Sequence, residues 1–182
     1  MKWYKVCNRI SLLLHALCSA AGYFLTDGPF SNKETNQIRG MLLSAHNAEE
    51  LYARSDLSEP FLGKIAKEEY GIALTFHHHM GTVVQDPDEV ERMMANTDPE
   101  YVSLLFDTGH FTYCGADPLE MVKKYVNRIK HVHLKDIRPE VVKEVKDNDL
   151  SFLEGVRRGA FTVPGDGCID FDPIFKVLEE NG

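Results

Sequence analysis

The sequence has few cysteines, and none of them stand in the pairs that bind structural zinc. Cys7, Cys18, Cys114 and Cys168 lie far apart, and no C-x-x-C motif occurs. This spacing disfavours a zinc knuckle or a disulfide framework and favours reduced thiols in a cytoplasmic protein. The chain also lacks runs of lysine and arginine, and its formal net charge is −8. We therefore expect no nucleic acid as a partner.

Long hydrophobic runs are also missing. The apolar stretch ISLLLHALCSAAG (10–22) follows the basic start MKWYKVCNR, but it is too short to span a bilayer. A basic start, an apolar run and small residues are typical of a secretory signal peptide. The alternative is a buried helix, or sequence foreign to the rest of the fold. We leave residues 1–57 as an unassigned N-terminal segment and expect a cytoplasmic protein without a membrane partner.

From residue 58 onward, short apolar segments alternate with amphipathic ones. The segments IALTF (72–76), YVSLLF (101–106) and IKHVHL (129–134) are predicted to be buried strands. They begin at residues 72, 101 and 129, which gives steps of 29 and 28 residues, the length of a βα unit. Apolar strands that alternate with helices indicate a parallel sheet covered by helices.

Signals for helix ends stand between these strands. Asp86-Pro87, Asp117-Pro118 and Asp172-Pro173 each place a capping aspartate before a proline at the first helical position. Gly71 is a natural end for a helix that begins near residue 58. Two architectures fit this order: a (β/α)₈ barrel and an open doubly wound sheet. No G-x-G-x-x-G turn follows a strand, which disfavours a nucleotide-binding Rossmann unit.

Metal-capable side chains follow all three strands, at the edge where parallel α/β folds carry function. Successive strand residues point to opposite sides, so we expect His77 and His79 to share a side and His78 to face the helix layer. The strand-end set on the functional side is His77, His79, Asp107, His110, His131, His133 and Lys135.

Histidine and aspartate ligands with open positions suit Mn²⁺, Co²⁺, Zn²⁺ or Fe²⁺ better than Ca²⁺. No cysteine stands at these strand ends, which disfavours a structural zinc site. A metal held in this way acts as a Lewis acid that binds a carbonyl and a neighbouring hydroxyl and stabilises an enediolate. The additional histidines and the lysine would then move protons.

Four stretches in order, HHHMGTVVQ, FDTGHFTYCGADP, HVHLKDIR and FTVPGDGCIDF, closely resemble the inosose dehydratase (2-keto-myo-inositol dehydratase) family. That family belongs to the xylose-isomerase-like TIM-barrel superfamily, and the likeness covers roughly residues 61–182. The resemblance implies a carbon–oxygen hydro-lyase of inositol catabolism that dehydrates 2-keto-myo-inositol to a trihydroxycyclohexanedione. It also implies Mn²⁺ or Co²⁺, with glutathione as a further cofactor, and a small cyclitol or sugar as substrate.

The resemblance also implies roles for individual residues. Asp107 and His133 match the superfamily's metal ligands, and His77 takes a place where many relatives carry a metal-binding glutamate. His110 matches a residue that contacts substrate hydroxyls and relays protons. His79 and Lys135 are expected to be catalytic or substrate contacts. Asp136 is expected to orient Lys135 or His133, and His131 is expected to be packed or to support a ligand from behind. Gly165, Asp166 and Gly167 are expected to form a substrate loop. A plain turn is the alternative for that loop, and Cys114 is expected to be a bystander.

The pattern departs from a complete barrel, which needs about 250 residues and eight strands. The first strands are not recognisable, and the family's last metal-binding glutamate lies beyond residue 182. We therefore expect residues 58–182 to form the C-terminal part of the barrel, with impaired activity and self-association through open barrel edges. A sugar isomerase or epimerase, a dehydroshikimate-type dehydratase and a non-catalytic barrel fragment are the alternatives. The excursion 137–163 is expected to be a lid or a helical surface insert.

Overall fold

The structure, a computed structural model, describes residues 59–82 and 84–181. Its centre is a parallel sheet in the order β1 (Leu74–His77), β2 (Val102–Asp107) and β3 (Ile129–His133). All three strands lie within three residues of the predicted positions. The predictions for residues 1–57, including the signal-like start, concern a segment outside the described residues.

Helices follow the strands as predicted. α4 (Glu59–Tyr70) precedes β1, α5 (Pro87–Ala95) connects β1 to β2, and α10 (Asp172–Asn181) lies near the C-terminus. α7 (Pro118–Tyr125) and a short 3₁₀ turn, Val126–Arg128, lead into β3. The aspartate caps work as expected at two of the helices. The Asp117 carboxylate accepts a hydrogen bond from the Leu119 amide, and Asp86 forms a capping box with Glu89.

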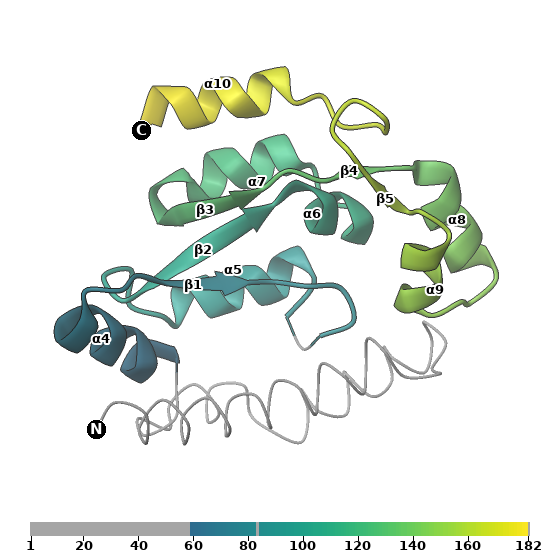
Figure 1. The fold of residues 1–182 in the computed structure, drawn as a ribbon. Coiled ribbons are helices and arrows are strands. Elements are labelled where there is room, and N and C mark those ends of the chain that lie inside the picture. Colours follow the sequence, from purple (N-terminus) through teal and green to yellow (C-terminus); the bar gives the residue numbers. More distant parts are fainter. Residues whose placement is uncertain (1–58, 83, 182) are drawn as a thin grey trace.

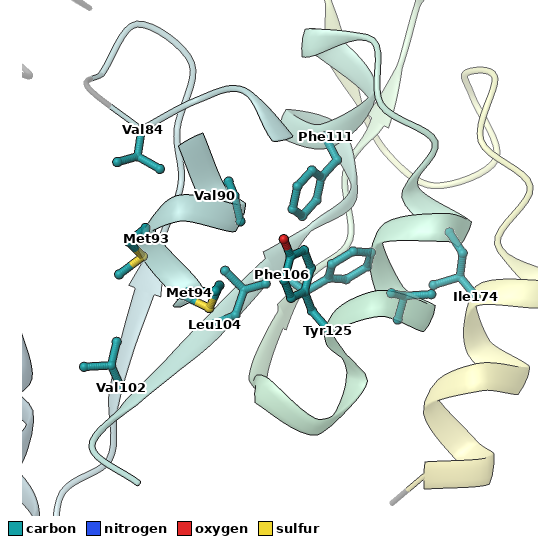
Figure 2. Close-up of a cluster of buried hydrophobic side chains, with 11 residues drawn as sticks. Val84, Val90, Met93, Met94, Val102, Leu104, Phe106, Phe111, Tyr125 and Ile174 are labelled. Atoms are coloured by element: carbon teal, nitrogen blue, oxygen red, sulfur yellow. The ribbon is translucent and has the colours of Figure 1, made fainter. Parts of the chain in front are cut away.

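The main hydrophobic core lies between the sheet and helices α5, α7 and α10 (Figures 1 and 2). Alternate residues of β2, Val102, Leu104 and Phe106, are fully buried in it. Because strand residues alternate, Asp107 is directed away from this core, toward the face that carries the histidines. Burial of the apolar face therefore fixes the direction of the Asp107 side chain.

Two features were not predicted. α6 (Thr108–Cys114) begins directly after β2, where the sequence indicated only a strand end. The Asp107 carboxylate caps it by accepting a hydrogen bond from the His110 amide at 3.1 Å. β4 (Asp136–Ile137) and β5 (Phe161–Thr162) form a second, antiparallel pair.

The excursion after β3 is a helical insert. α8 (Pro139–Asp147) and α9 (Phe152–Arg157) lie between β4 and β5, beyond the carboxyl ends of the central strands (Figure 1). They have their own core, to which Met80, Tyr113, Ile137 and Phe152 contribute. Of the two expectations, lid and helical insert, the structure supports the insert. No helix among the described residues has the length and apolarity needed to cross a membrane.

Candidate metal and catalytic site

The carboxylate of Asp107 is the point at which the three strand ends meet. Asp107 is fully buried as the last residue of β2. Its Oδ2 lies 3.2 Å from His77 Nε2 at the end of β1 and 3.3 Å from His133 Nδ1 at the end of β3. The Lys135 ammonium donates a hydrogen bond to the same oxygen at 2.5 Å. The structure therefore brings together the three residues expected to bind metal and one expected to act in catalysis.

The electrostatics keep Asp107 ionised. Burial acts to raise the pKa of Asp107, but the hydrogen bond from His77 and the positive charge of Lys135 outweigh it. The pKa of this carboxyl therefore lies far below its usual range. Burial lowers the pKa of His133, which favours the neutral ring that a metal requires.

The donor atoms fit a transition metal. Nδ1 of His133 is buried and has no hydrogen-bond partner within the described part of the chain, although it lies beside Asp107 Oδ2. His77, Asp107 and His110 also form a group whose ligand atoms lie within 4.8 Å of one another and could hold an ion. Imidazole and carboxylate donors of this kind suit Mn²⁺, Co²⁺ or Zn²⁺.

The rings of His79 and His110 lie against each other, tilted, next to this group. Their ring centroids lie 3.9 Å apart at an interplanar angle of 46°. Both rings bind the backbone of Met80. The Met80 amide donates to His110 Nδ1 at 3.3 Å, and His79 Nδ1 lies 2.8 Å from the Met80 carbonyl oxygen. Burial lowers the pKa of both rings. Met80 was not singled out in the sequence, because a backbone contact leaves no signal in the side chain.

His78 faces the opposite side, as the strand alternation predicted. Its ring lies 3.9 Å from that of Phe111 in the helix layer and is fully buried. Burial lowers its pKa to about 3. Phe152 and Phe161 from the insert approach His110, with ring centroids at 6.0 Å and 5.0 Å. The helical insert thus supplies an apolar wall next to His79 and His110.

Thr108 and Gly109 position Lys135. The Thr108 hydroxyl donates to the Lys135 carbonyl at 2.7 Å and accepts from the Lys135 amide at 3.0 Å. A Cβ added at Gly109 would lie 2.7 Å from the Lys135 Cβ, so only glycine permits this close approach. Neither residue was given a role from the sequence. Their place in the D-T-G-H motif, directly after a strand, was the available signal.

Asp136 has different partners from those expected. It was predicted to orient Lys135 or His133, but its buried carboxylate accepts hydrogen bonds from three amides of its own ribbon and the following loop. These are the amides of Ile137 at 2.8 Å, Gly165 at 3.0 Å and Ile169 at 3.0 Å. The reason is strand alternation, which directs Asp136 away from Lys135. Asp136 therefore organises the loop 163–169.

The Gly165-Asp166-Gly167 loop is a tight turn built on Asp136. Gly165 has a φ of +87°, and a Cβ at Gly167 would lie 2.4 Å from Asp136 Oδ1. The Asp166 carboxylate accepts from Arg138 at 2.5 Å and from the Thr162 hydroxyl at 2.7 Å. These contacts belong to the β4–β5 ribbon, so they agree with the plain turn, and a substrate role remains a prediction.

His131 and Cys114 occupy peripheral positions. His131 is exposed, and its ring meets that of His133 edge-on at 5.2 Å. It is therefore a neighbour of the His133 ring and is not packed in a core. The Cys114 thiol donates to the Phe111 carbonyl, and burial raises its pKa to about 11, as suits a bystander.

Residues 58–182 match the xylose isomerase-like TIM barrel family. The chain belongs to this family. Within it, the chain is 65% identical over 120 residues to an inosose dehydratase of Clostridium perfringens, covering 66% of this chain and 40% of that protein. It is 62% identical over 117 residues to an inosose dehydratase of Bacillus cereus, covering 64% and 39%. The chain thus spans about two fifths of the length of these curated relatives.

Two solved structures match part of the chain. One is a sugar phosphate isomerase/epimerase from Parabacteroides distasonis, with a TM-score of 0.47 and 24% identity over 68% of this chain and 39% of that one. The other is an IolI protein with a bound zinc atom, with a TM-score of 0.46 and 24% identity over 67% and 41%.

Proposed function

We propose that this chain carries the metal and proton-transfer site of a hydro-lyase that removes water from a ketonised inositol. The observation that carries the proposal is the convergence of β1, β2 and β3 on Oδ2 of Asp107. The identity of 58–65% with inosose dehydratases over about 120 residues supports the substrate class. A dione formed by loss of water is the expected product.

We assign the metal to His77, Asp107 and His133, with Mn²⁺ or Co²⁺ as the ion. His110 is left out because its Nδ1 already accepts a hydrogen bond from the Met80 amide. If Nε2 of the same ring also bound a metal, the ring would have to lose both protons. A bound ion would act as a Lewis acid toward the ketone oxygen of the substrate.

The chain's own residues would supply the rest of the chemistry. The Lys135 ammonium lies on Oδ2 of Asp107 and is partly exposed, so it can also bind a substrate hydroxyl. His79 and His110 lie beside the metal residues with Phe152 and Phe161 behind them, which excludes water from one side. A general acid or base in such a position contributes roughly a hundredfold to ten-thousandfold in rate.

Metal binding is the first test. The 182-residue chain is titrated with Co²⁺ or Mn²⁺, alongside Asp107→Asn and the control Glu91→Gln. Glu91 is an exposed carboxylate paired with Lys124, so its variant loses one charge away from the site. We expect one ion for the wild type and the control, and none for Asp107→Asn. Equal binding by all three would contradict the metal assignment.

Turnover is the second test. The metal-loaded chain is incubated with scyllo-inosose, with and without reduced glutathione, and products are identified by mass spectrometry. Loss of one water supports the dehydratase. A rearranged product of unchanged mass would instead indicate the isomerase or epimerase alternative. Turnover that does not depend on glutathione would remove that cofactor from the proposal.

Self-association and location complete the proposal. Within the described residues, β1 and β3 each pair with one neighbour, so each leaves one strand edge available to another chain. Sedimentation that depends on protein concentration would support pairing of two copies.

We place the protein in the cytoplasm, in agreement with cysteines that show no disulfide or zinc spacing.

A further inference from the structure

The backbone of Met80 binds two histidines through opposite groups. Nδ1 of His79 lies 2.8 Å from the Met80 carbonyl oxygen. A carbonyl oxygen can only accept a hydrogen bond, so this nitrogen must carry the proton. In a neutral His79 ring, Nε2 is then left with a free lone pair.

His110 has the reverse arrangement. The Met80 amide donates to Nδ1 of His110 at 3.3 Å, so this nitrogen must present its lone pair. The proton of the neutral His110 ring is therefore on Nε2. The backbone of His110 is held as well, because His110 is the third residue of α6 and its amide donates to Asp107 Oδ1.

The two rings are thus held as opposite tautomers in direct contact. Their centroids are 3.9 Å apart, and the His110 side chain is only 1% exposed. Phe152 lies against both rings, at 5.4 Å from His79 and 6.0 Å from His110. Water is therefore largely prevented from replacing the Met80 contact of His110, and the half-buried His79 ring is held by its 2.8 Å contact with the Met80 carbonyl oxygen, so each ring is kept in one tautomer.

We propose that the Met80 backbone selects these tautomers and so divides two catalytic roles between the histidines. His79 is the proton acceptor, and His110 is a neutral hydrogen-bond donor to the oxygen that becomes negative. This inference rests on the proposed dehydration and names the residues that move its protons.

The step is balanced without a further reactant. His79 Nε2 takes the proton from the carbon next to the ketone, and the electron pair of the broken C–H bond forms an enolate. The enolate oxygen accepts a hydrogen bond from Nε2–H of His110. Protonated His79 then returns the proton to the β-hydroxyl, the C–O bond breaks, and water leaves as the carbon–carbon double bond forms.

Nitrogen NMR of the full chain with isotope-labelled histidine tests the tautomers directly. Spectra are recorded at about pH 8, above the ordinary pKa of imidazole. His79→Gln and His110→Gln identify the two sets of signals. We expect a proton on Nδ1 of His79 and on Nε2 of His110. The opposite tautomer in either ring, or a rapid mixture of both, would overturn the inference whether or not the chain turns over.

Exchange of substrate hydrogen tests the division of roles. Inosose is incubated with the chain in D₂O, and deuterium next to the ketone is measured. His79→Asn retains an N–H for the Met80 carbonyl but lacks the acceptor, so exchange should fall by roughly a hundredfold or more. His110→Gln keeps an N–H donor and should lose about tenfold, whereas His110→Leu should lose a hundredfold or more. Equal losses for Gln and Leu would contradict the donor role.

The outcomes separate this inference from the proposed function. Exchange without loss of water would contradict the dehydratase and leave the histidine roles standing. Loss of water with undiminished exchange in His79→Asn would support the dehydratase and contradict the acceptor role of His79. Predicted tautomers in a wild-type chain that exchanges no substrate hydrogen would overturn the acceptor role of His79.

Discussion

At the scale of single residues, the buried hydroxyl of Tyr113 should lower the stability of the folded chain at alkaline pH. Its ring stacks on Phe161 at an interplanar angle of 3°, and its hydroxyl has no hydrogen-bond partner among the described residues. Burial raises the pKa of Tyr113 to about 12. Because the hydroxyl forms no bond, Tyr113→Phe should be as stable as the wild type at neutral pH, or more stable by up to about 1 kcal/mol.

The difference in stability between Tyr113→Phe and the wild type should grow above pH 10. In the unfolded chain tyrosine ionises near its ordinary pKa of about 10, whereas folded Tyr113 stays neutral to about 12. Wild-type stability is therefore lost as pH rises through this window, and Tyr113→Phe escapes that loss. The variant should gain roughly 1 kcal/mol near pH 11. Urea unfolding at about pH 8 and about pH 11 measures this; a gap that stays constant would contradict it.

Lys135 should lower the affinity of the site for a metal ion. Its ammonium lies on the same Asp107 oxygen that the proposed ion would use, so the two positive charges compete. Lys135→Met should bind Mn²⁺ more tightly, on the order of tenfold. Lys135→Arg keeps the charge and serves as the control, with affinity close to the wild type. Calorimetric titration measures all three chains. Weaker binding by Lys135→Met would show that the lysine supports the ion.

At the scale of elements, the close approach of α6 to the segment after β3 depends on Gly109. A Cβ there would lie 2.7 Å from the Lys135 Cβ and 3.0 Å from Phe161 Cδ1. Gly109→Ala should therefore push α6 and the β4–β5 ribbon apart and cost about 1–3 kcal/mol. Because Lys135 moves with the ribbon, metal affinity should change as well.

Gly115→Ala is the matched control for Gly109→Ala. Gly115 ends the same helix with a φ of +97°, and apart from its chain neighbours no heavy atom of the described residues lies within 4 Å of an added Cβ. Its variant should cost about 1 kcal/mol of backbone strain and leave metal affinity unchanged. Unfolding and metal titration of both variants check this. Equal effects on affinity would show that Gly109 acts only through helix stability.

The elements also show what the sequence could and could not predict. Local periodicity and capping chemistry account for the three strands, for the caps at Asp86 and Asp117, and for the direction of His78 toward the helix layer. The partners of Asp136 lie at positions 165 and 169, about thirty residues away, and no local rule connects them. The two-residue strands β4 and β5 depend on another long-range pairing, of Asp136 with Thr162 and of Ile137 with Phe161, and so were missed.

The candidate site was predictable for a different reason. Parallel strands end at one edge of a sheet, so side chains that follow β1, β2 and β3 had to meet there. The Met80 contacts were not predictable, because backbone groups bind the histidines and any residue type carries them. The positions of His79 and His110 could thus be inferred from sequence, but their tautomers could not.

At the scale of the whole molecule, the proposed ion would connect segments that are far apart in the chain. The last residues of three successive strands are His77, Asp107 and His133. They are separated by 30 and 26 residues along the sequence. An ion that binds only the folded chain stabilises it by mass action. At a hundredfold excess over the dissociation constant, Co²⁺ should raise the free energy of unfolding by about 2.7 kcal/mol.

Hydrogen exchange shows whether this stabilisation is shared by the sheet. Because the three ligands belong to three strands, added Co²⁺ should slow amide exchange in β1, β2 and β3 together. Asp107→Asn should show no such change, and Glu91→Gln should behave as the wild type, since Glu91 lies on α5 and pairs with Lys124. A chelator should reverse the protection. Slower exchange confined to one strand would contradict a site shared by all three, because a ligand bound to one strand cannot stabilise the pairing of the other two.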